Sequence, residues 1–160
     1  MSSYMKFAEI YDTLMKEDID YNKWVNYIES IFSHYGKNPK IVCDLACGTG
    51  NFTIPLSKLG YDMIGVDKSV EMLNIARSKS QNEGKNIMFL NQSISKLDLY
   101  GGCDAFLCMI DGFNYILSPK ALFNALKRIK DCFLEPDGSL IFDISSPYKL
   151  KKYLGNNSFI

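Results

Sequence analysis

Hydrophobic residues recur at intervals of three and four along residues 21–32, and the positions between them are mostly polar. The hydrophobic positions are Trp24, Val25, Ile28, Ile31 and Phe32. This spacing is typical of an amphipathic helix that buries one face against a core. Asp20 is suited to cap its first turn and Gly36 to end it. The pattern therefore predicts a helix that covers part of the domain.

After this helix, short hydrophobic runs alternate with segments of helical pattern. The runs that predict strands are residues 40–45, 62–66, 87–90, 105–109 and 139–143, the last entered through a turn at 135–138. The segments that predict helices are 51–59, 69–81 and 119–133, with Ser69 as a cap and Pro55 in a first turn. Strands that alternate with helices imply right-handed crossovers and a parallel sheet. The predicted fold class is therefore α/β.

The expected architecture is a Rossmann-like, doubly wound parallel sheet with helices on both faces and an N-terminal helical cap. We assign residues 1–36 to the cap and 37–145 to the core that would hold a cofactor. Residues 146–160 contain no clear strand or completed helix. We expect them to be the start of a substrate-side insert or a C-terminal tail, with the C-terminal strands of the sheet missing from this chain.

Charge and hydropathy exclude several classes of function. Eighteen basic residues balance eighteen acidic ones, so the chain lacks the positive field that non-specific nucleic-acid binding requires. The longest uninterrupted hydrophobic run covers six residues, 105–110, whereas a membrane-spanning helix needs roughly 20. The N-terminal residues lack the pattern of an export signal. We therefore expect a cytoplasmic protein without nucleic-acid or membrane partners.

The five cysteines are an odd number and are widely spread, which favours reduced thiols in a cytoplasmic protein. Cys43 and Cys47 are separated by three residues, and no pair has the CxxC spacing of a zinc site. His34 is the only histidine. The sequence therefore predicts no metal site.

The segment DLACGTGN (residues 44–51) lies between the first predicted strand and the next helix. Gly48 and Gly50 allow a tight turn and close approach of a ligand, although tight turns favour glycine for structural reasons alone. Dinucleotide sites have a third glycine where this chain has Thr53, and Asp44 would lie beside their pyrophosphate. Like charges at about 4 Å repel by roughly 4 kcal/mol at an effective dielectric of 20. The turn therefore favours a ligand with an ammonium or sulfonium group over a phosphate.

Asp67 ends the second predicted strand, seventeen positions after Gly50. Adenosine-binding folds place there the acid that accepts hydrogen bonds from the ribose hydroxyls. The alternative is that Asp67 only caps the next helix, a role for which Ser69 is already suited. Met72, one turn into that helix, can either wall an adenine or belong to the core. The turn and Asp67 together predict a site for an adenosine ligand that carries positive charge.

Four segments, in this order and spacing, carry a resemblance to a known family: DLACGTGNF (44–52), GVDKSVEML (65–73), DAFLCMIDGFNYI (104–116) and PDGSLIFD (136–143). Together they resemble the class I S-adenosylmethionine-dependent methyltransferases. The resemblance extends from about Phe7 to Asp143, and its N-terminal part is similar to a small bacterial branch of that family. It implies the cofactor S-adenosyl-L-methionine and the transfer of its methyl group.

The resemblance also implies which residues hold the cofactor. They are Asp44, Ala46, Cys47, Gly48, Gly50, Asp67, Lys68, Met72, Gln92, Ser93, Ile94 and Met109, together with Tyr4 and Tyr11 of the N-terminal arm. Asp44 would support the methionyl ammonium group, Asp67 would bind the ribose, and residues 92–94 would meet the adenine edge. Many relatives have an acid where this chain has Ser93. Many have glycine where it has Ala46, a change that we expect to be harmless.

Three residues would face the transferred methyl group by the same resemblance. They are Asp111 and Asn114, which follow the fourth predicted strand, and Tyr11 in the N-terminal arm. Asp111 is a candidate general base, but a contact with the cofactor or the turn chemistry of Asp-Gly explains it equally well. Tyr4 and Tyr11 match tyrosines that relatives fold over the cofactor, and hydrophobic packing of the arm is the alternative.

The predicted function is methyl transfer from S-adenosylmethionine to a small molecule, such as an amine or hydroxyl of a metabolite. The balanced charge favours this function over a nucleic-acid methyltransferase. Two alternatives stay open. One is a non-catalytic module that binds the cofactor or a partner, and the other is a nicotinamide dehydrogenase, which Asp44 and Thr53 oppose.

Overall fold

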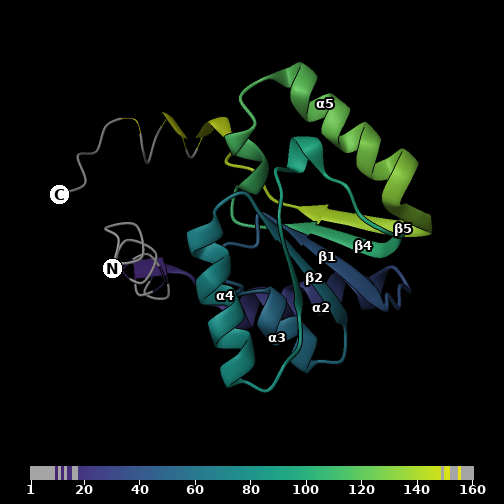
Figure 1. The fold of residues 1–160 in the computed structure, drawn as a ribbon. Helices are drawn as coiled ribbons and strands as arrows, with labels where there is room; N and C mark the ends of the chain where they lie inside the picture. Colours follow the sequence, from purple (N-terminus) through teal and green to yellow (C-terminus); the bar gives the residue numbers. More distant parts are fainter. Residues whose placement is uncertain are drawn as a thin grey trace.

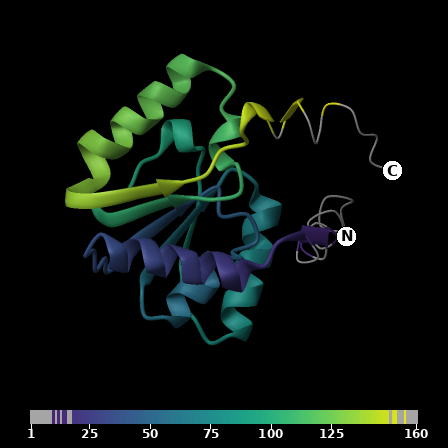
Figure 2. The ribbon, with the colours of Figure 1, turned by 180° about the vertical axis from the view of Figure 1, so that it is seen from behind.

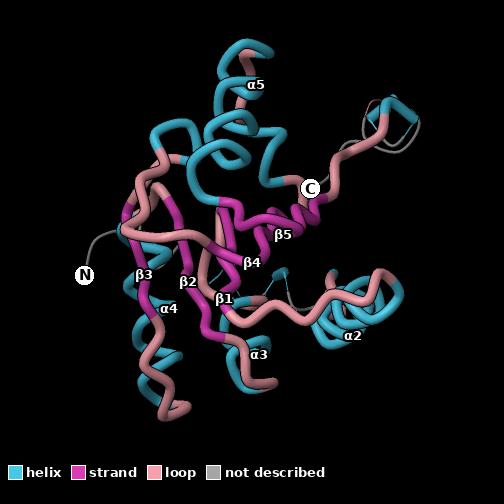
Figure 3. Tube along the Cα trace, turned by 90° about the vertical axis from the view of Figure 1, so that its right-hand side faces the viewer, coloured by secondary structure: helices cyan, strands magenta, loops and turns pink. Residues whose placement is uncertain are grey.

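Five parallel strands form a single sheet in the computed structural model, which describes residues 10, 12, 14, 15, 18–148, 150, 151 and 155. The strands are β1 (Ile41–Leu45), β2 (Asp62–Asp67), β3 (Met88–Asn91), β4 (Cys103–Cys108) and β5 (Leu134–Phe142). Their order across the sheet is β3-β2-β1-β4-β5, and every neighbouring pair is parallel (Figure 3). The predicted α/β class and Rossmann-like sheet are confirmed.

Helices cover both faces of the sheet, with α2, α3 and α4 on one face and α5 on the other (Figures 1 and 2). Their bounds are Tyr21–His34 (α2), Thr53–Lys58 (α3), Val70–Asn82 (α4) and Pro119–Arg128 (α5). Three shorter pieces are the 3₁₀ helices η1 (Ile94–Lys96) and η2 (Gly112–Tyr115) and the π-helical turn η3 (Ile129–Phe133). None of the helices in the described part of the chain is long and hydrophobic enough to cross a membrane.

Local sequence determines where these helices begin. The side chain of Asp20 accepts a hydrogen bond from the backbone N–H of Lys23 at 3.0 Å, and Ser69 accepts one from Met72 at 3.2 Å. Both residues are therefore the N-caps that the sequence predicted. Pro55 lies in the first turn of α3, where its missing N–H costs no helical hydrogen bond.

The sheet separates two large hydrophobic cores, and a smaller cluster of Cys47, Leu73, Ala76 and Phe89 lies where α4 packs on the sheet. The core beneath α2 and α3 consists of Val25, Ile28, Phe32, Val42, Phe52, Leu56, Met63, Ala105, Leu107 and Met109. The core on the α5 side consists of Cys43, Leu45, Val66, Leu97, Cys103, Phe106, Cys108, Phe113, Ile129 and Phe133. Successive residues of β4 alternate between the two cores, and all are buried from Ala105 to Cys108. This burial on both faces explains why the strand is an unbroken hydrophobic run in the sequence.

The strand β5 differs from the prediction because it begins before the expected turn. Leu134 already pairs with Cys103, and the next pair is Ala105 with Ser139, so the ladder is irregular between them. Asp137, within that stretch, has a left-handed backbone with φ of 63°. The predicted turn at 135–138 is therefore a bulge inside a longer strand. The predicted helix 119–133 likewise ends at Arg128 and continues only as the π turn.

Burial of Ile28 tests whether α2 is part of the folded unit. Ile28 is 0% exposed in the α2–α3 core, so truncation removes apolar contacts and leaves a cavity. We expect Ile28→Ala to lower the free energy of unfolding by about 2–5 kcal/mol in urea denaturation. Tyr27→Ala, at a neighbouring position that is 57% exposed, is the control and should change it by less than about 0.5 kcal/mol. Equal effects of the two substitutions would contradict the packing of α2.

Candidate active site

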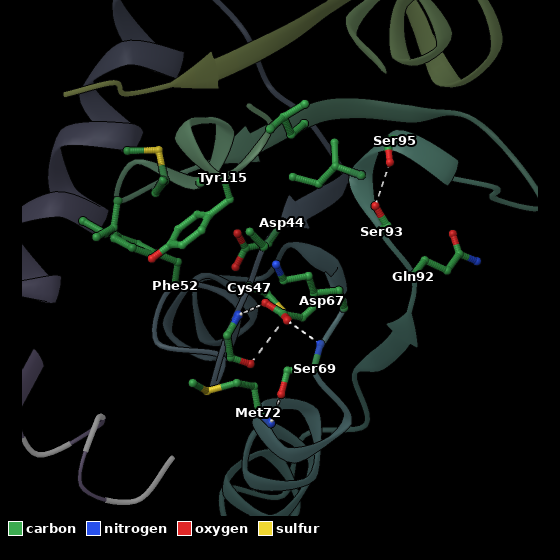
Figure 4. Close-up of a pocket in the computed structure, with 18 of the residues that line it drawn as sticks. Asp44, Cys47, Phe52, Asp67, Ser69, Met72, Gln92, Ser93, Ser95 and Tyr115 are labelled. Carbon is green, nitrogen blue, oxygen red and sulfur yellow. Dashed lines mark hydrogen bonds between the residues drawn. The ribbon is translucent and has the colours of Figure 1, made fainter. Parts of the chain in front are cut away.

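A cavity of about 570 Å³ opens at the carboxyl ends of β1, β2 and β4. The strand order reverses between β1 and β4, and such a reversal leaves a crevice at this edge of a parallel sheet. Small-molecule sites have volumes of roughly 300–1,000 Å³, so the cavity has an ordinary size for one. The predicted cofactor residues that line it are Asp44, Ala46, Cys47, Gly48, Asp67, Lys68, Met72, Gln92, Ser93, Ile94 and Met109 (Figure 4).

The two glycines of the turn after β1 have different surroundings. A Cβ atom added to Gly48 would meet no atom within 4 Å, so the backbone there faces open space. A Cβ atom on Gly50 would lie 3.2 Å from Ile54 Cδ1 and 3.3 Å from the Cβ of Ala76. Gly48 therefore lets a ligand approach the backbone, whereas Gly50 lets the turn pack against two helices. Gly50 is not among the residues that line the cavity.

Ala46 has a left-handed backbone with φ of 55°, a conformation that residues other than glycine rarely adopt. That conformation costs roughly 1–2 kcal/mol relative to the right-handed one. A glycine at this position would avoid the cost. The expectation that alanine is harmless here stays a prediction, and the structure adds that Ala46 lies at the cavity wall with this left-handed backbone.

Asp44 is 1% exposed, at the end of β1. Its Oδ2 accepts a hydrogen bond from the Thr53 hydroxyl at 2.6 Å. Burial and, to a smaller extent, the negative charge of Asp67 raise the pKa of Asp44 to about 7, although the hydrogen bonds from Thr53 act in the opposite direction. Thr53 therefore stabilises Asp44 through this hydrogen bond. The sequence indicated only that Thr53 stands where a dinucleotide site would have its third glycine. A positive ligand in the cavity would favour the ionised form of Asp44.

Asp67 connects the glycine turn to the loop after β2. Its Oδ2 accepts from the backbone N–H of Gly48 at 2.9 Å, and its Oδ1 accepts from the N–H of Ser69 at 2.8 Å. A carboxylate offers about four acceptor positions, so two protein bonds leave capacity for two ligand hydroxyls. The cap of α4 is made by the Ser69 side chain, so capping by Asp67 does not explain this arrangement.

The residues after β3 form another wall of the cavity. The Gln92 side-chain amide donates to the backbone carbonyl of Asp98 at 2.9 Å and accepts from the Asp98 N–H at 2.9 Å. It thereby holds the loop around η1, and its end points away from the other labelled residues in Figure 4. Ser93 shares a hydrogen bond of 2.8 Å with Ser95. An adenine edge would therefore meet the Ser93 hydroxyl and backbone rather than the Gln92 amide.

Three aromatic residues of the cavity wall were not predicted. The Tyr115 ring, on η2, points into the cavity and lies 5.6 Å from the Lys68 ammonium group, a contact that joins the β4 and β2 sides (Figure 4). Tyr21, at the start of α2, contacts the ring of Phe52 edge-to-face, with 5.2 Å between ring centroids. In the sequence, only their aromatic character could have indicated a place in the site. Many core residues are aromatic too, so this property did not distinguish them.

Two of the predicted catalytic residues, Asp111 and Asn114, are not among the described residues that line the cavity. Asp111 donates its backbone N–H to Asp143 Oδ2 at 3.0 Å, and its own Oδ2 accepts from the Ser145 hydroxyl at 2.6 Å. Its left-handed backbone, with φ of 58°, directs the chain toward η2. Asn114 is exposed and also absent from the cavity lining. Tyr4 and Tyr11 lie outside the described residues.

The fold and cavity define a class of protein, a Rossmann-like domain with a ligand-sized cavity at the carboxyl ends of its strands and two carboxylates in its lining. A family model described as "Methyltransferase domain" matches residues 42–138. The chain therefore belongs to the class I S-adenosylmethionine-dependent methyltransferase family. The family and the cofactor that the sequence predicted are confirmed. Within the described part of the chain, no group of three or more potential metal ligands comes together.

Relatives and solved structures match most of this chain. A methyltransferase-family protein of Geobacillus sp. (strain WCH70) is 34% identical over 92% of this chain and 60% of its own length. A solved S-adenosylmethionine-dependent methyltransferase of Clostridium acetobutylicum is 38% identical, with a TM-score of 0.87, over 99% of this chain and 64% of that one. The sugar N-methyltransferase KedS8 of Streptoalloteichus shares the fold at 22% identity, with a TM-score of 0.75, over 86% and 54%. The chain spans about three fifths of the length of the curated relatives it matches.

The cavity suits S-adenosylmethionine in three respects. Gly48 exposes its backbone to the cavity without a side chain that would block a ligand. Asp67 keeps acceptor capacity for the two ribose hydroxyls. Asp44 supplies a buried carboxyl group, ionised in the presence of a positive ligand, near the turn that would hold the methionyl ammonium group. These residues would bind and orient the cofactor.

Substitution of Asp67 tests the ribose contact. We expect Asp67→Ala to weaken binding of S-adenosylmethionine by about 10- to 100-fold, because hydrogen bonds to a charged group are each worth about 1.5–3 kcal/mol. Titration calorimetry measures the dissociation constant. Asp62→Ala removes an exposed carboxylate at the opposite end of the same strand and should leave binding unchanged. An unaltered dissociation constant for Asp67→Ala would show that Asp67 does not contact the cofactor.

The raised pKa of Asp44 predicts that cofactor binding depends on pH. An ionised Asp44 attracts the positive ligand and a protonated one does not, so binding should release a proton and tighten as pH rises through about 7. Between pH 6 and 8 the fraction of ionised Asp44 increases about tenfold, and affinity should increase by about the same factor. Asp44→Asn should abolish the part of the pH dependence of affinity that comes from Asp44. Titration of the ligand itself affects the wild type and the variant equally. Parallel pH profiles for the two proteins would contradict the prediction.

Proposed function

We propose that this protein transfers the methyl group of S-adenosylmethionine to a small-molecule acceptor, with an amine preferred over a hydroxyl. The observation that carries the proposal is the pair of carboxylates, Asp44 and Asp67, on either side of a glycine turn that opens into the cavity. The cofactor supplies an electrophilic methyl group on a positively charged sulfur. The protein then needs to hold an acceptor lone pair in line with it.

Positioning alone supplies much of the rate of such a displacement, roughly 7–11 kcal/mol for well-aligned reactants. The wall that faces the cofactor from β4 and η2 is largely apolar, with Met109, Ile110 and Ile116 among its residues. An apolar wall excludes water and helps to keep an amine neutral, with its lone pair free. This side of the cavity is where we place the acceptor.

The charges in the cavity favour a small amine. Among the described residues of the cavity lining, the carboxylates are Asp44 and Asp67, and both serve the cofactor in this proposal. A neutral amine attacks without prior loss of a proton, whereas a hydroxyl acceptor benefits from a general base. Lys68 is the one basic residue in that described lining, which offers little attraction to a phosphate backbone. The similarity in fold to a sugar N-methyltransferase is compatible with this acceptor class.

Methyl transfer from labelled cofactor tests the proposal. The full-length protein is incubated with S-adenosylmethionine that carries a radioactive methyl group and with small amines, including amino sugars, each paired with its hydroxyl analogue. We expect label in an amine product and at least tenfold less in the hydroxyl analogue. At a cofactor concentration near the wild-type dissociation constant, Asp67→Ala should transfer about 5- to 50-fold less label, because its weaker binding lowers cofactor occupancy by that factor. Label in RNA or protein would overturn the acceptor class. Tight cofactor binding without any transfer would support a non-catalytic module.

A further inference from the structure

A cluster of polar side chains lies on the outer side of the glycine turn, away from the two acids of the cavity. Asp12, from the segment before α2, places its Oδ1 at 2.5 Å from the Thr49 hydroxyl and at 2.8 Å from Asn51 Nδ2. Its Oδ2 lies 3.0 Å from the ammonium group of Lys79, on α4. Lys79 also donates to Asn51 Oδ1 at 2.6 Å. One carboxylate therefore joins three segments that are far apart in the sequence.

The cluster is shielded from solvent. The side chain of Asp12 is 13% exposed and that of Lys79 is 28% exposed, and Thr49 is 2% exposed. Burial would raise the pKa of Asp12, but the hydrogen bonds from Thr49, Lys79 and Asn51 outweigh it and lower the pKa. Asp12 is therefore negatively charged at neutral pH. Shielded charge-assisted hydrogen bonds hold a geometry better than exposed ion pairs do.

The residues that Asp12 binds belong to the turn that faces the cofactor. Thr49 and Asn51 flank Gly50, and both also line the main cavity. Gly48, one residue earlier, donates its N–H to Asp67, the predicted ribose acid. A shift of Thr49 would therefore move the N–H that orients Asp67.

We propose that Asp12 is a positioning residue that fixes the glycine turn in its cofactor-binding conformation through Thr49, Asn51 and Lys79. This inference rests on the proposed function because it needs the cavity to bind S-adenosylmethionine. Asp12 acts from outside the cavity and is not a member of its lining. By linkage, a ligand that prefers the ordered turn also strengthens the attachment of the segment that carries Asp12.

Calorimetric titration with S-adenosylhomocysteine, which is stable and keeps the adenosyl group, tests the role of Asp12. We expect Asp12→Ala to weaken binding by about 10- to 100-fold, the range set by lost charge-assisted hydrogen bonds, and Asp12→Asn to have a smaller effect. Lys79→Met should also weaken binding, and the double variant Asp12→Ala/Lys79→Met should be no worse than Asp12→Ala because both changes remove one cluster.

The matched control is Asp131→Ala, which removes the carboxylate of an exposed ion pair with Lys127 at 2.6 Å. It should leave the dissociation constant unchanged. Thermal unfolding without ligand separates positioning from folding: a lower melting temperature with unchanged affinity in Asp12→Ala would overturn the proposal. If Asp12→Ala does not fold, the same two measurements are made on Asp12→Asn. Unaltered binding of S-adenosylhomocysteine by that variant would overturn the inference.

Hydrogen exchange gives a second readout that a merely structural role would not move. In the wild type, S-adenosylhomocysteine should slow exchange of the peptide around Asp12, and in Asp12→Asn this protection should be reduced at saturating ligand. Equal protection in both proteins would contradict the coupling. Failure of the wild type to bind either adenosyl ligand would instead refute the proposed function, so the two failures are distinguishable.

Discussion

Two carboxylates of like charge, held close together at the ends of neighbouring parallel strands, set the character of this protein. Asp44 is the penultimate residue of β1 and Asp67 ends β2, and burial together with the charge of Asp67 raises the pKa of Asp44. Bonds from Thr53, Gly48 and the N–H of Ser69 offset part of the repulsion between them. A positively charged ligand would offset the rest, which is why the site is matched to a sulfonium cofactor rather than a phosphate.

The glycine turn depends on support from both sides. Inside the cavity, the N–H of Gly48 bonds to Asp67, and outside it Thr49 bonds to Asp12. Behind the turn, Gly50 packs closely against Ile54. A short loop with left-handed residues would otherwise have many accessible conformations, and ordering them on ligand binding would cost affinity. The surrounding elements remove that freedom before a ligand arrives.

Local sequence was sufficient to predict most of the fold, and most of the residues predicted to hold the cofactor line the cavity. The alternation of hydrophobic runs with amphipathic segments predicted the strands and the helices, and parallel topology then placed Asp44 and Asp67 at one edge. The bulge in β5 was not predicted. Residues 135–138 are typical of a turn, and the sequence does not show that the residues on both sides of them pair with β4. Asp111 was predicted from its position after β4, but its backbone angles and its bond to Ser145 keep it out of the cavity lining.

The sequence by itself determined the fold class, the glycine turn and the two acids, since these depend on periodicity and on residues near the ends of strands. The cofactor followed from the resemblance of four segments to a known family. Only the tertiary structure decided the remaining contacts of the site. Thr53 reaches Asp44, and Asp12 binds Thr49 across 37 positions of the sequence. Such contacts depend on where crossovers bring distant side chains and on the backbone angles of the loops. No local pattern of hydrophobic and polar residues records either of these.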